Sequence, residues 1–84
     1  MSINKLCRAF ANEDRVKLLV CLSQEKSVSE LLDYCHLSQS ALSQHLKILR
    51  DAKVVETHKS GKYILYKVSD KKVTNIAKLL LNYK

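Results

Sequence analysis

The chain lacks three features that would place it outside the cell or in a membrane. Its three cysteines are an odd number, and the positions Cys7, Cys21 and Cys35 form no Cys-x-x-Cys motif, which excludes a disulfide framework and the common zinc and redox motifs. No apolar run approaches the roughly 20 residues of a membrane span, and the N-terminus lacks the apolar stretch of a signal peptide. The sequence therefore predicts a protein of the reducing cytoplasm with no membrane partner.

Acidic residues are scarce relative to basic ones. Fifteen lysines and arginines against eight aspartates and glutamates give the 84 residues a formal charge of +7. The excess lies late, because residues 53–72 contain six lysines and two acidic side chains. A field of this sign favours a polyanion, and nucleic acid is the commonest one inside cells. We expect one domain, residues 1–84, that buries roughly 60–65% of its unfolded surface and gains further stability by self-association.

The stretch LSQSALSQHLKILR, residues 37–50, has the pattern of an amphipathic helix. Ser38 is placed to cap it, and an apolar stripe follows at helical spacing: Ala41, Leu42, Leu46 and Leu49. The opposite face carries hydroxyls, amides and cations without a carboxylate: Gln39, Ser40, Ser43, Gln44, Lys47 and Arg50. Such a helix fits the DNA major groove in width and in hydrogen-bonding chemistry. An ordinary surface helix has the same pattern, so the neighbouring elements decide between the two interpretations.

Three shorter helices are predicted before this stretch. Residues 2–10 form the first, and Asn12 caps the second, which is apolar over a wide arc and should be the most buried. We expect residues 23–27 to form a surface loop. Ser27 and Glu30 then form a capping box that starts the third helix. Two helices joined by a short turn, the second with a polar face, are typical of a helix-turn-helix.

After residue 52 the apolar pattern changes from helical to alternating. It predicts a strand over residues 54–57, a turn over residues 58–62 and a return strand over residues 63–68. Gly61, the only glycine, lies at the tip, where a positive φ is needed. A hairpin at this position is a wing, and two of its lysines would contact phosphates beside the groove: Lys59 and Lys62. The prediction is a mainly α winged helix-turn-helix with four helices, a β-hairpin and a final helix.

The final helix, capped by Ser69 or Asp70, is more apolar than docking on a small core requires. Its apolar positions are Val73, Ile76, Ala77, Leu79, Leu80 and Leu81. We predict a homodimer through this helix, with the helix of residues 2–10 packed alongside. In the alternative, the final helix covers only its own domain.

Three phrases give the chain a resemblance to a known family. They are LCRAFANEDR at residues 6–15, LSQSALSQHL at residues 37–46 and GKYILY at residues 61–66. With the order of elements, they resemble the ArsR/SmtB family of small dimeric bacterial repressors, and within it the thiol-sensing haemolysin-regulator branch. The resemblance implies a homodimer that binds an imperfect inverted repeat of double-stranded DNA in a promoter. It also implies release from DNA when an effector binds or oxidises the protein.

The resemblance further implies which residues contact DNA. The matching positions are Gln39, Ser40, Ser43, Gln44 and Lys47 in the helix, and Lys59 and Lys62 in the wing. Ser38, the predicted helix cap, is included as a candidate DNA contact. His45 lies in the family's Ser-x-His-Leu phrase, where it either contacts a phosphate or is hydrogen-bonded within the fold.

The metal sites of the family do not match this sequence. Ser27 and Ser29 occupy the positions of a Cys-x-Cys thiolate pair, and hydroxyls do not replace thiolates for soft metals. In the last-helix site, Lys72 occupies the histidine position two residues after Asp70, and an ammonium group has no lone pair for zinc. We therefore expect no metal and no cofactor.

Thiol sensing in this branch pairs a cysteine late in the second helix with one near the end of the last helix. Cys21 lies one residue from the first position, and the last helix has no cysteine. Three alternatives stay open: a single reactive thiol at Cys21 or Cys7, a site formed by all three cysteines, or no effector. Cys7 and Cys21 lie on apolar faces, where burial is the competing interpretation. Cys35, at a helix C-terminus, is expected to be exposed but unreactive, because that end disfavours a thiolate.

Other functions fit the sequence less well. An enzyme needs converging acids, bases or a nucleophile, and no such set or phosphate loop is present. A winged-helix domain that binds proteins instead of DNA should expose aromatics or leucines on the helix of residues 37–50. RNA binding usually needs exposed aromatics, and Tyr63 and Tyr66 are better explained as strand residues. The sequence therefore predicts a sequence-specific DNA-binding transcriptional repressor of the nucleoid.

Overall fold

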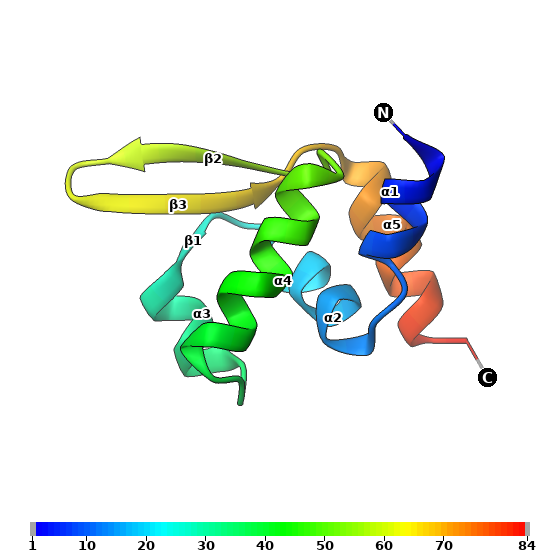
Figure 1. The fold of residues 1–84 in the computed structure, drawn as a ribbon, viewed down its shortest axis with the longest axis horizontal. Coiled ribbons are helices and arrows are strands. Elements are labelled where there is room, and N and C mark those ends of the chain that lie inside the picture. The colour runs from blue at the N-terminus through cyan, green and yellow to red at the C-terminus, as the bar shows by residue number, and fades with distance from the viewer. Residues whose placement is uncertain (1, 84) are drawn as a thin grey trace.

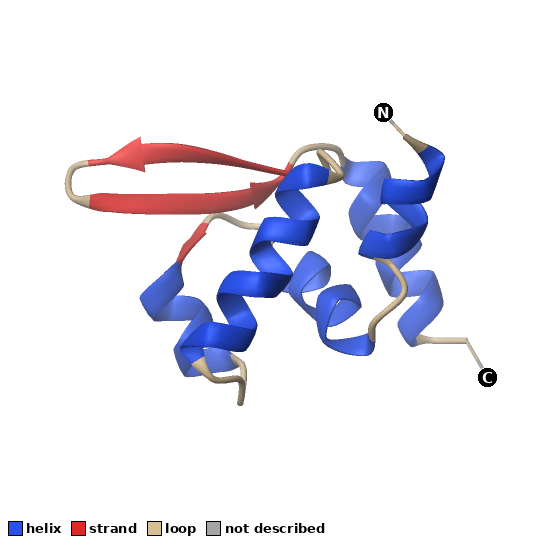
Figure 2. Ribbon diagram, viewed as in Figure 1, coloured by secondary structure: helices blue, strands red, loops and turns tan. Residues whose placement is uncertain are grey.

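The computed structural model describes residues 2–83 as five helices and a three-stranded antiparallel sheet (Figures 1 and 2). In chain order the elements are α1 (Ile3–Ala9), α2 (Glu13–Cys21), β1 (Lys26–Ser27), α3 (Val28–Tyr34), α4 (Gln39–Asp51), β2 (Val55–Ser60), β3 (Tyr63–Val68) and α5 (Lys71–Leu81). This order confirms the winged helix-turn-helix, with α3 and α4 as its two helices and β2 and β3 as the wing. Figure 1 shows the wing reaching out on one side of the molecule, opposite α1 and α5. In residues 2–83 we find no helix with the length and hydropathy that a bilayer span requires.

Local capping fixes where the helices begin. Asn12 Oδ1 accepts an amide of the first turn of α2 at 3.2 Å, and Ser38 Oγ does the same for α4 at 3.1 Å. Ser27 and Glu30 exchange both bonds of the predicted capping box, at 3.3 and 3.1 Å. Of the two candidates before α5, Asp70 is the cap. The sequence therefore predicted these helix starts correctly, because each depends on contacts within three residues.

The core forms where α2 packs against both α4 and α5. The largest fully buried side chains are Leu18, Leu19, Leu22, Leu31, Leu42, Leu49 and Val54. Three of them lie in or directly after α2, in agreement with its prediction as the most buried helix. The apolar stripe of α4 faces this core, so the polar side of α4 faces outward.

The turn after α4 contains a residue with a left-handed backbone. Lys53 has φ 61°, a conformation that L-residues other than asparagine and aspartate adopt rarely. Its amide donates to the Arg50 carbonyl at 2.9 Å, and the Val54 amide donates to the Leu49 carbonyl at 3.2 Å. These bonds satisfy carbonyls at the end of α4 and turn the chain directly into β2.

The wing is longer, and its turn tighter, than the sequence predicted. β2 and β3 pair along their full length, and Gly61 and Lys62 alone connect them. The predicted turn over residues 58–62 is therefore wrong at its start, because His58, Lys59 and Ser60 belong to β2. Their polar side chains hid the strand, since pairing of an exposed hairpin needs backbone groups and not apolar side chains. Gly61 has φ 60°, as expected at the tip.

The loop predicted over residues 23–27 contains a short strand. Lys26 and Ser27 form β1, which pairs antiparallel to β3 with Lys26 opposite Tyr66 and Ser27 opposite Leu65. Two residues are too few for an alternating pattern, and the partner is distant in sequence, so no local signal marks β1. The strand order β1-β3-β2 places β3 in the centre and anchors the base of the wing to the helical body.

Candidate nucleic-acid interface

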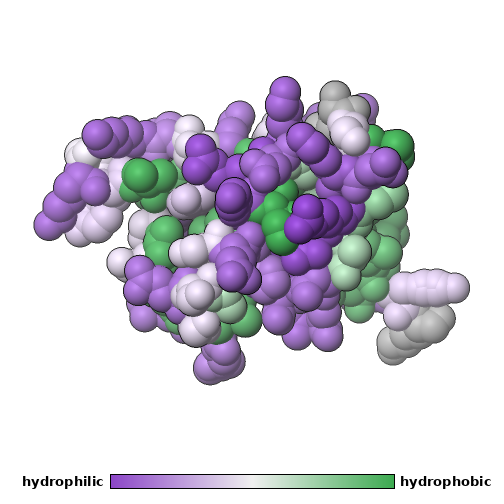
Figure 3. All heavy atoms as spheres, in the orientation of Figure 1, coloured by the Kyte–Doolittle hydropathy of each residue, from purple (hydrophilic) through white to green (hydrophobic). Residues whose placement is uncertain are grey.

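The exposed face of α4 gathers most of the residues expected to contact DNA. Burial of Leu42, Leu46 and Leu49 fixes the rotation of the helix. On the other side the structure exposes Gln39, Ser40, Ser43, Gln44 and Lys47. Ser38 is exposed as well, but its hydroxyl already accepts the Ala41 amide at 3.1 Å. Figure 3 shows a largely hydrophilic surface over α4.

His45 is hydrogen-bonded within the fold. Its ring is half-buried, and Nδ1 lies 3.3 Å from Nη1 of Arg15 on α2. A guanidinium group can only donate, so Nδ1 accepts and the ring proton of the neutral imidazole lies on Nε2. Of the two alternatives for His45, the structure provides the bond within the fold, and it leaves Nε2 as the nitrogen that could donate to a phosphate.

Arg15 is a central residue of this region that the sequence did not reveal. It is 9% exposed, and Nη2 donates to the Arg8 carbonyl oxygen at 2.8 Å. Its Nε has no hydrogen-bond partner among residues 2–83. Burial lowers the pKa of Arg15, and the positive charge of Arg8 lowers that pKa further. The available signal was a cation in the first turn of a helix, where the helix dipole disfavours it.

The wing presents its two predicted lysines at the far end of β2 and in the turn. Lys59 and Lys62 are both exposed, and Lys62 Nζ lies 5.6 Å from the ring centroid of Tyr63. Nearer the helices, His58 Nδ1 contacts a carboxylate oxygen of Glu25, in the loop after α2. The wing therefore extends its cations away from the body while its base is held by contacts to the rest of the domain.

The sequence of residues 12–57, more than half of the chain, matches the protein-family model described as bacterial regulatory protein, arsR family. The chain belongs to the ArsR family. The matched range contains α2, both helices of the helix-turn-helix and the start of the wing. This ArsR-family chain is a winged helix-turn-helix DNA-binding transcriptional regulator.

Relatives confirm the resemblance to the haemolysin-regulator branch. The transcriptional activator HlyU of Vibrio cholerae is 43% identical over 76 residues, which cover 89% of this chain and 70% of that protein. The transcriptional repressor SmtB of Mycobacterium tuberculosis is 38% identical over 73 residues, which cover 86% of this chain and 54% of that protein. A solved structure of HlyU from Vibrio cholerae has a TM-score of 0.83 and 40% identity, and the match covers 98% of this chain and 92% of that one.

The family's metal sites do not fit the residues of this ArsR-family chain. The hydroxyl of Ser27 accepts the Glu30 amide in the capping box, and the carboxylate of Asp70 accepts the Lys72 amide at 2.9 Å as a helix cap. Within the part of the chain that the structure describes, no group of three or more His, Cys, Asp and Glu side chains is placed to hold a metal ion.

Two of the cysteines are placed differently from the expectation. Cys7 is exposed on α1, so the burial that its apolar neighbours suggested does not occur in the single chain. Cys35, expected to be the most exposed, is half-buried because its side chain packs against the core. Burial raises the pKa of the Cys35 thiol, and Cys21 and Asp14 raise that pKa further.

Cys21 and Cys35 share one cavity of about 480 Å³. It lies where the end of α2 meets the turn between α3 and α4, and residues from several elements line it: Asp14, Lys17, Val20, Cys21, Tyr34, Cys35, His36, Leu37 and Leu81. Of the three-cysteine site left open above, the structure brings together Cys21 and Cys35 without Cys7, and their proximity depends on how α2 packs against the helix-turn-helix.

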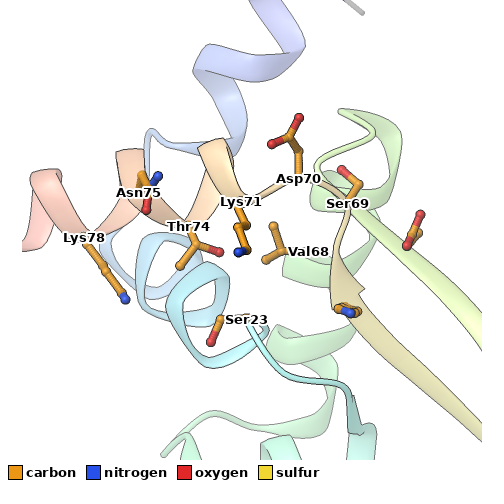
Figure 4. Close-up of a pocket in the computed structure, with 10 residues that line it drawn as sticks. Ser23, Val68, Ser69, Asp70, Lys71, Thr74, Asn75 and Lys78 are labelled. Carbon is orange, nitrogen blue, oxygen red and sulfur yellow. The ribbon is translucent and has the colours of Figure 1, made fainter.

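A second cavity, also about 480 Å³, lies between the base of the wing and α5 (Figure 4). Its lining includes three lysines and two carboxylates: Lys67, Lys71, Lys78, Glu56 and Asp70. In Figure 4 the side chains of Lys71 and Thr74 project toward its middle. Because α4 contributes no residue to it, this cavity is separate from the candidate DNA-binding face of α4.

Proposed function

We propose that the chain acts as a homodimeric repressor that binds an inverted-repeat promoter site through α4. The observation that carries this proposal is the exposed face of α4, where hydroxyls, amides and a cation are contributed by Gln39, Ser40, Ser43, Gln44 and Lys47. The one carboxylate of α4, Asp51, is the last residue of the helix. Gln44 is assigned to a base edge, since a glutamine amide bonds adenine bidentately in the major groove. Lys59 and Lys62 are assigned to phosphates, which position the protein without reading sequence. Such a regulator acts on the chromosome, in the cytoplasm.

The homodimer is supported by an apolar surface that the single chain leaves uncovered. On α5, Leu79 is 73% exposed, with Ile76 and Leu80 also exposed, and on α1 Ile3 is 69% exposed. Figure 3 shows apolar atoms gathered at this end of the molecule. Contiguous patches of this kind mark interaction surfaces. Two-fold pairing through α5, with α1 alongside, would cover the patch and present two α4 helices to half-sites about 10 base pairs apart.

Repression is proposed because it requires only a DNA-binding surface and a dimer surface, and no further protein-binding surface. A dimer bound across a promoter blocks access by occupancy alone, whereas activation needs an additional contact with the transcription machinery. The relatives include both an activator and a repressor, so transcription from the bound promoter must be measured directly.

Thiol control is the regulation that the cysteines support. Cys35 ends α3 and leads into the turn before α4, and it shares a cavity with Cys21. Joining two thiols as a disulfide removes two electrons and two protons, which a diazene oxidant such as diamide accepts. A change at Cys35 would act directly on the turn that positions α4. The exposed Cys7, on α1 beside the proposed dimer surface, is the alternative point of oxidation.

The test is binding to a labelled duplex of about 30 base pairs from the region upstream of the chain's own gene, followed by fluorescence anisotropy beside a scrambled duplex. Reduced protein should bind the promoter duplex as a dimer with Kd of about 10⁻⁸ M or tighter at physiological salt. Diamide should weaken binding, and the variants Cys7→Ser, Cys21→Ser and Cys35→Ser should identify the thiols responsible.

Different results contradict different parts of the proposal. Equal binding of the reduced and oxidised protein removes thiol control and leaves DNA recognition intact. Increased transcription from the bound promoter in vitro contradicts repression. Binding to neither duplex at any salt concentration contradicts DNA recognition and favours the protein-interaction alternative.

A further inference from the structure

Arg8, in the last turn of α1, lies beside the polar face of α4. Its side chain is exposed and lines a hollow of about 320 Å³ with four residues of α4: Gln44, Lys47, Ile48 and Asp51. Gln44 and Lys47 belong to the face assigned above to DNA. The guanidinium group of Arg8 therefore extends this face onto a second helix, which the sequence pattern did not indicate.

Positive charge at this junction is poorly compensated within the chain. Arg15 lies directly behind Arg8, bonded to its carbonyl oxygen, and is more than nine-tenths buried with its Nε unpartnered among residues 2–83. In that described part of the chain, neither arginine forms an ion pair with a carboxylate. Asp51 is the one carboxylate that lines the hollow, and Arg8 and Lys47 outnumber it. An anion placed here would offset charges that the fold leaves unmatched.

The dimensions of DNA supply that anion when α4 occupies the major groove. α1 packs against α4, and packed helices lie about 8–10 Å apart. The major groove is about 12 Å wide, so it admits one helix and not two. When α4 enters the groove, α1 therefore lies over its edge, where the phosphates of the backbone are.

We propose that Arg8 binds a backbone phosphate at the edge of each half-site, next to the groove that α4 enters. This inference rests on the proposed function and adds a contact from α1 to those of α4 and the wing. An arginine suits the role because its planar guanidinium bonds two phosphate oxygens at once. The bond from Arg15 fixes the backbone of Arg8 at the point where α1 ends, so the exposed side chain extends from a fixed position beside α4.

The test compares Arg8→Ala and Arg8→Lys with the wild-type protein on the promoter and scrambled duplexes, from about 50 to 200 mM salt. Arg15 bonds the carbonyl of Arg8 and not its side chain, so Arg8→Ala should keep the fold, which circular dichroism checks. Arg8→Ala should bind both duplexes about five- to tenfold more weakly. Its slope of log K against log salt should fall by about 0.9 per protomer, or about two units for a dimer.

Matched variants separate a phosphate contact from a change in total charge. Lys17→Ala removes the same charge at α2, where Glu13 pairs with Lys17 at 3.3 Å, and it should leave the salt slope unchanged. Arg8→Lys keeps the charge and should keep the slope while losing part of the affinity.

The outcomes distinguish this inference from the proposed function. Wild-type affinity and slope in Arg8→Ala overturn the inference alone, as does a loss confined to the promoter duplex, which would make Arg8 a base-reading residue. Equal slope changes in Lys17→Ala and Arg8→Ala also overturn it, because net charge would then explain both. A wild-type protein that binds no duplex overturns the proposed function together with the inference.

Discussion

Replacing Gln44 by alanine tests the proposal that α4 reads the base sequence of DNA. The side chain is exposed, so its truncation should change the free energy of unfolding by less than about 0.5 kcal/mol. A bidentate contact between an amide and a base contributes about 1–3 kcal/mol of discrimination, and a dimer places one Gln44 in each half-site. The promoter duplex should therefore lose about 2–6 kcal/mol of binding free energy, which is roughly 30-fold to 25,000-fold in Kd.

Binding to the scrambled duplex shows whether this loss of binding free energy is specific to the promoter sequence. Gln44→Ala should leave binding to that duplex almost unchanged, since affinity for random DNA comes from phosphates. Lys62→Ala is the matched control at the wing tip: it should weaken both duplexes alike and lower the salt slope by about 0.9 per protomer. If both variants lose the same affinity on both duplexes, the division between base reading on α4 and phosphate binding on the wing is refuted.

Three further substitutions and one alkylation experiment test the fold, the dimer and the thiols. Arg15→Met should lower the free energy of unfolding, measured with urea, by about 1–2 kcal/mol, because two hydrogen bonds are lost but the cost of burying a charge is removed. Lys53→Gly should raise that free energy by about 1 kcal/mol, since glycine adopts the left-handed backbone without strain. Leu79→Glu should yield folded monomers in light scattering, because the side chain is exposed in the single chain and the charge opposes pairing. Near neutral pH, Cys35 should react with iodoacetamide more slowly than Cys7 and accelerate as pH rises, because its pKa is raised and the thiolate is the nucleophile.

Each of these expectations has a result that contradicts it. Unchanged or increased stability in Arg15→Met would mean that the stabilisation by the two hydrogen bonds of Arg15 does not exceed the free-energy cost of burying its charge. A lower free energy of unfolding in Lys53→Gly would show that the left-handed backbone at Lys53 is not a source of strain. Dimers of Leu79→Glu would exclude the α5 surface from the interface, and equal alkylation rates at all pH values would contradict the raised pKa of Cys35.

The parts of the fold predicted correctly are those with local signals. The caps Asn12 and Ser38 and the positive φ of Gly61 each depend on a few neighbouring residues, and all three occur as expected. The apolar stripe of α4 likewise predicted which of its faces would be buried, because helical periodicity is a property of the sequence alone.

The features missed by the sequence depend on contacts between distant segments. β1 exists because Lys26 and Ser27 pair with β3, about 40 residues later along the chain. The bond of Arg15 to His45 depends on how α2 packs against α4, and no pattern within either helix encodes it. The exposure of Cys7 and the half-burial of Cys35 likewise depend on which distant elements cover them, and no pattern around either residue encodes this.

Helix α2 connects the thiol cavity to the two helices, α1 and α4, that carry the proposed DNA contacts. Its nine residues span about 14 Å along the helix axis. In its first turn, Arg15 bonds α1 and the His45 ring of α4, and at its last residue, Cys21 lines the cavity shared with Cys35. A core packed as densely as a crystal passes on small displacements instead of absorbing them. Under the proposed thiol control, the cavity has two connections to α4: the turn after Cys35, and α2 with the bonds of Arg15 to His45 and to the Arg8 carbonyl.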